Sequence, residues 1–145
     1  MQATGVTCGD EIPSSFEEFK LQKGDYKGVT FITYKMTAKL DSIVVDVVGK
    51  VGQGYEEFVE SLPPNECRYA AVDIHFETVD GRQTSKLVFF TWIPDTAKIR
   101  AKMVYAASKK VLQSELTGLG IMINANDFSD LDYESYIKPE VMKYA

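Results

Sequence analysis

At 145 residues, the chain has the length of one domain that can bury most of its apolar surface without disulfides or metals. Hydrophobic residues make up 45% and charged residues 26%, which is ordinary for a soluble globular protein, and the net charge of −5 argues against general nucleic-acid affinity. The two cysteines are too few for a disulfide scaffold. Because no stretch approaches the roughly 20 apolar residues of a membrane span, and no signal-peptide pattern opens the chain, we expect a cytoplasmic protein.

Hydrophobic periodicity predicts alternating helices and strands along the chain. The small, polar residues 1–8 are expected to form a flexible N-terminal arm. In chain order, the predicted elements are a helix at 11–19, strands at 29–34 and 42–48, a helix at 55–62, strands at 68–77 and 85–92, a helix at 95–112, a strand at 121–123 and a helix beginning at 126 or 127. This order predicts a mixed α/β fold with helices on both faces of one sheet.

Two helix boundaries are predicted from individual residues. Asp95 or Thr96 is expected to cap the long helix, and Asn126 or Asp127 the last one. Pro139 disfavours α-helix at Lys138, so residues 138–145 are expected to form a C-terminal tail.

The long helix at 95–112 divides into two arcs at 100° per residue. One arc is small and mostly apolar, and is expected to lie on the sheet: Ala97, Ala101, Val104, Ser108, Val111 and Leu112. The opposite arc mixes lysines with apolar side chains: Lys98, Ile99, Lys102, Met103, Ala106, Lys109 and Lys110. Exposed apolar residues framed by positive charge indicate a docking surface for an acidic partner. The alternative is a solvated helix face with two scattered apolar side chains.

These residues also carry a resemblance to a known family. The run WIPDTAKIRAKMVYAASKKVL, residues 92–112, resembles the signature of the actin-depolymerising factor/cofilin family. Three further segments resemble the family in the same order: ATGV at 3–6, LPPNECRYAAVDIHFE at 62–77 and NANDFSDLDYES at 124–135. The resemblance implies one ADF-homology domain over residues 1–145, with a central mixed sheet of about five strands flanked by helices on both faces.

The resemblance also implies an actin-binding function, with binding of monomers and filaments and promotion of filament depolymerisation. Carried over by motif, the monomer-binding surface consists of Thr4, Gly5, Val6, Arg100, Lys102, Met103 and Asp127. Thr4 occupies the regulatory phosphorylation position of the family, which is commonly serine. Anionic phosphoinositides are a further candidate ligand, and the protein is expected to be a cytoskeleton-associated monomer.

A second, filament-only surface is implied at Arg82 and Lys86. Thr84 stands where the family commonly has a basic residue, and the tail around Pro139 lacks the arginines that are common there. We therefore expect weak severing. The alternative is a mainly monomer-binding, sequestering protein of the same fold.

No pattern in the sequence indicates catalysis, a metal or a cofactor. His75 is the single histidine, and the chain lacks G-x-S-x-G, H-E-x-x-H and paired cysteine ligands. Asp73, Asp95 and Asp127 each have a structural role available in a strand, a turn or a cap. We expect a binding protein rather than an enzyme, with Cys67 a buried small hydrophobe.

Overall fold

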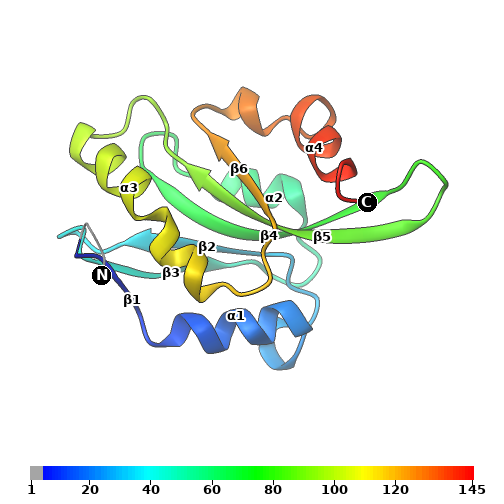
Figure 1. Cartoon of the computed structure of the whole chain (residues 1–145), viewed down its shortest axis with the longest axis horizontal. Helices are drawn as coiled ribbons and strands as arrows, with labels where there is room; N and C mark the ends of the chain where they lie inside the picture. The colour runs from blue at the N-terminus through cyan, green and yellow to red at the C-terminus, as the bar shows by residue number, and fades with distance from the viewer. Residues whose placement is uncertain (1–4) are drawn as a thin grey trace.

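The computed structural model describes residues 5–145, which form one six-stranded sheet between two layers of helices (Figure 1). The strand order is β1-β3-β2-β4-β5-β6. The strands are β1 Thr7–Cys8, β2 Phe31–Met36, β3 Ser42–Val48, β4 Arg68–Glu77, β5 Gln83–Trp92 and β6 Ile121–Ala125. The mixed α/β fold predicted from the sequence is confirmed, and β1 is the strand that the prediction of about five did not include.

Neighbouring strands of the sheet are antiparallel except at its two edges. The β2–β3 and β4–β5 hairpins are antiparallel, as is the central β2–β4 pair. The edge strands β1 and β6 instead pair in parallel, with β3 and β5 respectively. The sheet is therefore mixed, and the crossover from β5 to β6 is made by the long helix.

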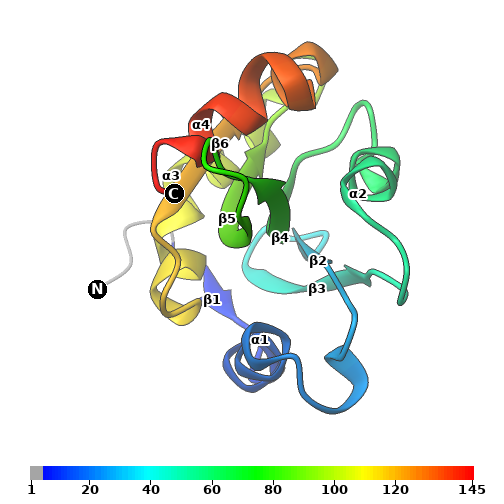
Figure 2. The same ribbon diagram turned by 90° about the vertical axis from the view of Figure 1, so that its right-hand side faces the viewer.

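Helices cover the two faces of the sheet, as expected (Figure 2). One face carries α1 Glu11–Leu21 and α3 Ile99–Glu115. The other carries α2 Tyr55–Ser61 and the C-terminal series η2 Phe128–Leu131, η3 Tyr133–Ile137 and α4 Lys138–Met142. A short 3-10 turn, η1 Gly24–Tyr26, connects α1 to β2.

The alternation of strand side chains builds two hydrophobic layers. In β4, Tyr69 and Ala71 face the α1/α3 side, whereas Ala70 and Val72 face the α2/α4 side. All four are buried, because helices cover both faces of this central strand. His75 lies further along β4, where its side chain is exposed as predicted, with Nε2 3.4 Å from Asp73 Oδ2.

The flexible arm expected at residues 1–8 is in part a strand. Thr7 and Cys8 pair with Ser42 and Ile43 of β3, and the Thr7 N–H donates to the Asp41 carbonyl at 3.1 Å. Val6 is completely buried. Composition suggested flexibility, but the open edge of β3 provides backbone partners that the local sequence does not reveal. Residues 1–4 lie outside the described part of the chain.

The long helix begins later than predicted. Neither Asp95 nor Thr96 caps it, because α3 starts at Ile99, with Lys98 at the capping position and no side-chain cap. The Thr96 hydroxyl instead donates to the side-chain oxygen of Asn65 at 2.6 Å. Residues 93–98 therefore form a connection that is tied to the segment before β4.

The predicted break at Lys138 is wrong. The π-helix η3 ends at Ile137 and runs directly into α4, and the backbone of Lys138 is α-helical at φ −58 and ψ −48. Pro139 lies in the first turn of α4, where a missing N–H is tolerated. Ile137 and Val141 are both fully buried on the sheet, so tertiary packing overrides the local preference against helix before proline.

Candidate protein-binding site

The sheet-facing side of α3 is fixed by buried polar contacts as well as by apolar packing. The Tyr105 hydroxyl accepts a hydrogen bond from the Met36 N–H at 2.7 Å, and the Tyr105 carbonyl accepts one from the Tyr69 hydroxyl. Ser108 and Leu112 are buried on the same side, as predicted. The predicted arc left out Tyr105, although its spacing from Ala101 and from Ser108 would have placed it there.

The opposite side of α3 is open and mixes apolar with basic groups. Ile99 and Met103, one turn apart, are 73% and 67% exposed, and Arg100 is exposed between them. Lys102 is half-buried, and its Nζ donates to the Asp95 carbonyl at 3.1 Å. This bond fixes the Lys102 side chain against the connection that precedes the helix.

The charge of this helix contrasts with that of the whole chain. Residues 98–110 contain five basic residues and no acidic one, in a chain with a net charge of −5. The basic residues are Lys98, Arg100, Lys102, Lys109 and Lys110. A local positive field around two exposed apolar side chains fits an acidic protein partner.

The start of η2 lies beside the connection into α3. The Ile93 N–H donates to the Ala125 carbonyl at 3.0 Å, and the rings of Trp92 and Phe128 pack with centroids 4.7 Å apart.

Asp127 caps η2, as predicted, by accepting from the Ser129 N–H at 2.8 Å. The hydrogen bonds from Ser129 lower the pKa of the Asp127 carboxyl, which is exposed, so this residue remains an anion at the surface. Phe128 is 42% exposed, and the sequence analysis did not include it in the site.

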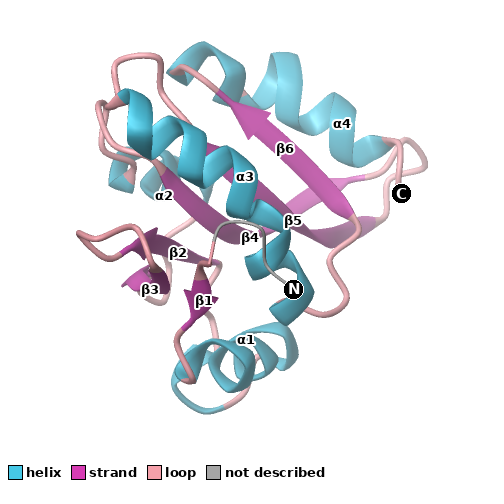
Figure 3. Ribbon diagram, turned by 60° about the vertical axis from the view of Figure 1, so that its left-hand side comes forward, coloured by secondary structure: helices cyan, strands magenta, loops and turns pink. Residues whose placement is uncertain are grey.

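The N-terminal segment reaches the same side of the molecule. Cys8 Sγ lies 3.8 Å from the Val111 carbonyl of α3, which places β1 beside the helix (Figure 3). Gly5 is exposed, with a φ of +71° that favours glycine. Val6, predicted as a contact residue, is completely buried, and Thr4 lies outside the described residues.

A basic groove of about 500 Å³ separates the tip of the β2–β3 hairpin from the start of α3. It is lined by Lys39 and Leu40 of the hairpin and by Lys98 and Arg100 at the helix end. Sequence reasoning missed the hairpin residues, because nothing in their local pattern shows that they face the helix.

The two residues predicted for the filament surface lie apart from α3, on the β4–β5 hairpin. Lys86 pairs with Ile74 and Thr84 with Phe76, so the side chains of Lys86 and Thr84 lie on the α2/α4 face.

Arg82 is exposed in the turn between β4 and β5, and its Nε donates to Asp80 Oδ2 at 3.1 Å. A shallow cavity near this turn is lined by Arg82 together with the C-terminal residues Met142 and Ala145. The structure thus brings the turn and the end of the chain together.

The described residues offer little for catalysis. No group of three or more His, Cys, Asp or Glu side chains within residues 5–145 is placed to hold a metal ion. Burial raises the pKa of both the Cys8 and the Cys67 thiols to about 11, so neither is a thiolate at neutral pH. Within the same residues, no helix combines the length and apolar character needed to cross a bilayer.

A helix with an exposed apolar and basic face, extended by two flanking segments, is typical of a protein-binding domain. The family model described as Cofilin/tropomyosin-type actin-binding protein matches residues 5–139. The chain belongs to this family.

Individual relatives agree with that assignment. The chain is 44% identical to cofilin of Yarrowia lipolytica over 139 residues, covering 95% of this chain and 88% of that protein. It is 39% identical to actin-depolymerizing factor 6 of Oryza sativa subsp. japonica, covering 91% and 92%. Among solved structures, Streptomyces griseoflavus cofilin superposes with a TM-score of 0.82 at 32% identity, covering 94% of this chain and 97% of that one.

Proposed function

We propose that this protein binds actin monomers and filaments and promotes filament depolymerisation, with α3 as its central contact. The observation that carries the proposal is the exposed face of α3, where Ile99 and Met103 stand among basic side chains. Names of relatives support it, since they include cofilin and actin-depolymerizing factor. The proposal includes no enzymatic activity.

The flanking segments are part of the proposed monomer surface. A stable interface buries about 800 Å² on each partner, more than one face of a single helix offers. The N-terminal segment that contains Gly5 extends the surface along α3. The start of η2, at Asp127 and Phe128, extends it beside the connection that leads into α3. We propose Arg100, Lys102 and Met103 as its centre, and we propose that the buried Val6 anchors the N-terminal segment instead of touching actin.

Two parallel assays test the proposal. Affinity for monomers is measured with fluorescently labelled ADP-actin, and filament binding by co-sedimentation with assembled actin. We expect saturable binding in both, and an increased rate of depolymerisation on dilution of filaments. Failure to bind monomers under any nucleotide condition would overturn the proposal.

We propose in addition that filament side-binding is weaker than monomer binding and that severing is weak. On the proposed filament surface, Thr84 is neutral, and Arg82 is already paired with Asp80. Directly after α4, Lys143 Nζ lies 3.3 Å from Glu140 Oε1, and this carboxylate offsets the lysine charge. The continuous helix through Pro139 removes the structural argument for weak severing, so the proposal rests on charge alone. The same charge argument favours, as the second candidate function, a protein that mainly binds actin monomers.

Substituting Thr84→Arg is expected to strengthen filament side-binding and to increase severing. The new guanidinium would lie on the same face as Lys86, and each added exposed charge contact contributes about 0.2–1 kcal/mol. Severing is counted on single fluorescent filaments at matched occupancy, with Thr84→Gln as the uncharged control. Vigorous severing by the unmodified protein, with no gain in the arginine variant, would contradict this proposal.

We also propose phosphorylation of Thr4 as an off-switch. Three residues span at most about 10 Å, and Thr7 is hydrogen-bonded to Asp41, next to the groove formed by Lys39, Lys98 and Arg100. A phosphate carries about −1.5 to −2 charges, and at Thr4 it would be within reach of these cations.

The phosphomimetic Thr4→Asp is therefore expected to weaken monomer binding several-fold, whereas Thr4→Ala should bind as the unmodified protein does. The effect should shrink at high salt, because charge interactions at the surface are screened. Equal affinities for the two variants in a monomer-binding titration would count against the switch.

The remaining expectations concern cell context. We propose a monomeric, cytoplasmic protein associated with the actin cytoskeleton, without nucleic-acid affinity. Anionic phosphoinositides are proposed as a further ligand of the basic residues on α3. Gel filtration tests whether the protein is a monomer, and a vesicle-binding assay tests whether it binds phosphoinositides.

A further inference from the structure

Strand β6 forms an open edge of the sheet between α3 and α4 (Figure 3). Its only strand neighbour among residues 5–145 is β5. Exposed edge strands present unpaired N–H and C=O groups, and proteins commonly protect them by shortening the strand or by adding charged residues or proline. The other edge, β1, is only two residues long. Residues 120–126, in contrast, read GIMINAN, with no charge and no proline.

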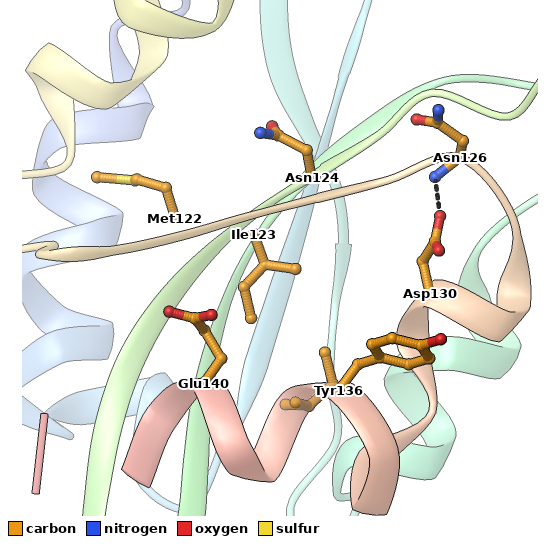
Figure 4. A pocket seen from close by; sticks show the side chains of 8 residues that line it. Met122, Ile123, Asn124, Asn126, Asp130, Tyr136 and Glu140 are labelled. Carbon is orange, nitrogen blue, oxygen red and sulfur yellow. Dashed lines mark hydrogen bonds between the residues drawn. The ribbon is translucent and has the colours of Figure 1, made fainter. Parts of the chain in front are cut away.

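The pairing with β5 shows which backbone groups of β6 are free. The Ala125 carbonyl points to β5, because it accepts from the Ile93 N–H. Backbone groups of alternate residues point to opposite edges of a strand. The N–H and C=O groups of Met122 and Asn124 therefore point away from β5, toward solvent. The next outward-facing N–H, that of Asn126 just after β6, is already occupied, because it donates to Asp130 Oδ2 at 2.9 Å (Figure 4).

A groove of about 390 Å³ lies along this edge, between β6 and the C-terminal helices. Its floor includes Ile123, and its far wall includes Tyr136, Asp130 and Glu140, with the Glu140 side chain directed toward β6 in Figure 4. Among residues 5–145, none of those that line the groove is basic. Glu140 Oε1 is 3.3 Å from Lys143 Nζ in an exposed pair, which holds the carboxylate only weakly.

We infer that the edge of β6 binds an extended peptide segment with basic residues at alternate positions. An antiparallel strand would exchange two hydrogen bonds with Met122 and two with Asn124. Residues opposite Met122 and Asn124 would face the α3 side, and those between them would face the groove. Lysine or arginine at the groove-facing positions would then approach Glu140 and Asp130.

The charges argue against a second copy of this chain as the occupant. Two β6 strands paired edge to edge would bring the Glu140 and Asp130 carboxylates of both copies toward one seam. Like charges so placed repel, and the chain as a whole is acidic at −5. A basic segment of another protein gains from the same groups. This binding is separate from the actin contacts proposed for α3, and its test needs no actin.

The probe is the fluorescein-labelled hexapeptide acetyl-TKVKVT-amide, whose lysines share one face and whose valines share the other. Its affinity is measured by fluorescence anisotropy at low salt, and its position by the amide shifts of ¹⁵N-labelled protein. We expect the largest shifts at Met122 and Asn124. Two analogues should bind at least ten-fold more weakly: acetyl-TEVEVT-amide, and the lysine peptide N-methylated at both valines, which lacks the edge-facing donors.

Three variants complete the test. Glu140→Lys should weaken the lysine peptide at least ten-fold and improve binding of the glutamate peptide, whereas Glu60→Lys, an equal charge change on exposed α2 surface, should alter both far less. Asn124→Pro removes one outward N–H, a substitution that edge strands tolerate, and should weaken the lysine peptide at least five-fold. If that variant does not fold, the N-methylated peptide tests the other bonds of the same residue pairs, those from the valine N–H groups to the Met122 and Asn124 carbonyls.

Several results would overturn the inference. The first is a set of amide shifts centred away from β6. The second is equal affinity of the protein for the N-methylated and the parent lysine peptide. The third is an equal loss of affinity for the lysine peptide in Glu140→Lys and Glu60→Lys. Broadening of the Met122 and Asn124 amides with protein concentration alone would show that a second copy occupies the edge instead.

Discussion

Replacing Arg100 and Lys102 together with alanine is expected to abolish actin binding while the fold stays nearly intact. Both side chains lie on the proposed docking face of α3, beside the exposed Met103. Truncating a charged anchor at the centre of an interface commonly costs about 2–4 kcal/mol of binding free energy. That cost corresponds to a loss of affinity of about 30- to 1,000-fold.

Stability should change little in this double variant, because neither side chain is part of the core. Arg100 is exposed, and Lys102 contributes a single bond to the Asp95 carbonyl at the surface. Substitutions at such positions usually change the free energy of unfolding by no more than about 0.5 kcal/mol. Urea unfolding, followed by circular dichroism, measures this directly.

The matched control is Lys23→Ala with Lys27→Ala. It removes the same charge from two exposed positions in the connection between α1 and β2, one on each side of η1. We expect its actin affinity to stay within about two-fold of the unmodified protein, since distant exposed charges are largely screened at physiological salt. If the α3 variant bound as tightly as this control, α3 would not be the contact surface.

The substitution Phe58→Ala should give the reverse result, a large loss of stability with actin affinity retained. Phe58 is fully buried on the face of the sheet opposite α3, and its ring packs against those of Phe31 and Phe90 with centroids 5.8 and 5.0 Å apart. Removing a buried phenylalanine side chain costs about 3–5 kcal/mol, through lost burial and the cavity left behind. For a chain of this size the melting temperature should fall by about 8–15 °C.

Calorimetry measures the loss, and Val79→Ala is its control, because Val79 is 94% exposed in the β4–β5 turn. Actin binding is compared at 10 °C, where both variants should be folded. Retained affinity would show that the α2 layer supports the fold without shaping the α3 surface. A loss of monomer binding as large as that of Arg100→Ala/Lys102→Ala, in protein shown to be folded, would contradict this separation.

Several features of the site could be predicted because they depend on neighbours in the sequence. The helical spacing of Ser108 and Leu112 predicted their burial, and the same spacing predicted the exposure of Met103. The Asp127 cap was also predictable, since its hydrogen bonds reach only two residues ahead. Alternation in β4 correctly predicted an exposed His75.

Other features depend on segments far apart in the chain, and the sequence did not reveal them. Val6 was expected in a flexible arm and is buried, because the edge of β3, more than 30 residues away, supplies the partner for β1. Lys39 joins the basic groove only because the β2–β3 hairpin folds toward α3.

By itself, the sequence determined the order of helices and strands and the basic, apolar face of α3. Both follow from local spacing, because side chains three or four residues apart share one face of a helix and side chains two apart share one face of a strand. Only the tertiary structure decided that the helix continues through Pro139, where burial of Ile137 and Val141 outweighs a local backbone preference. It also decided that β6 ends the sheet with Met122 and Asn124 facing outward. Which strand lies at an edge depends on how all strands pair, and pairing is set by contacts between distant residues.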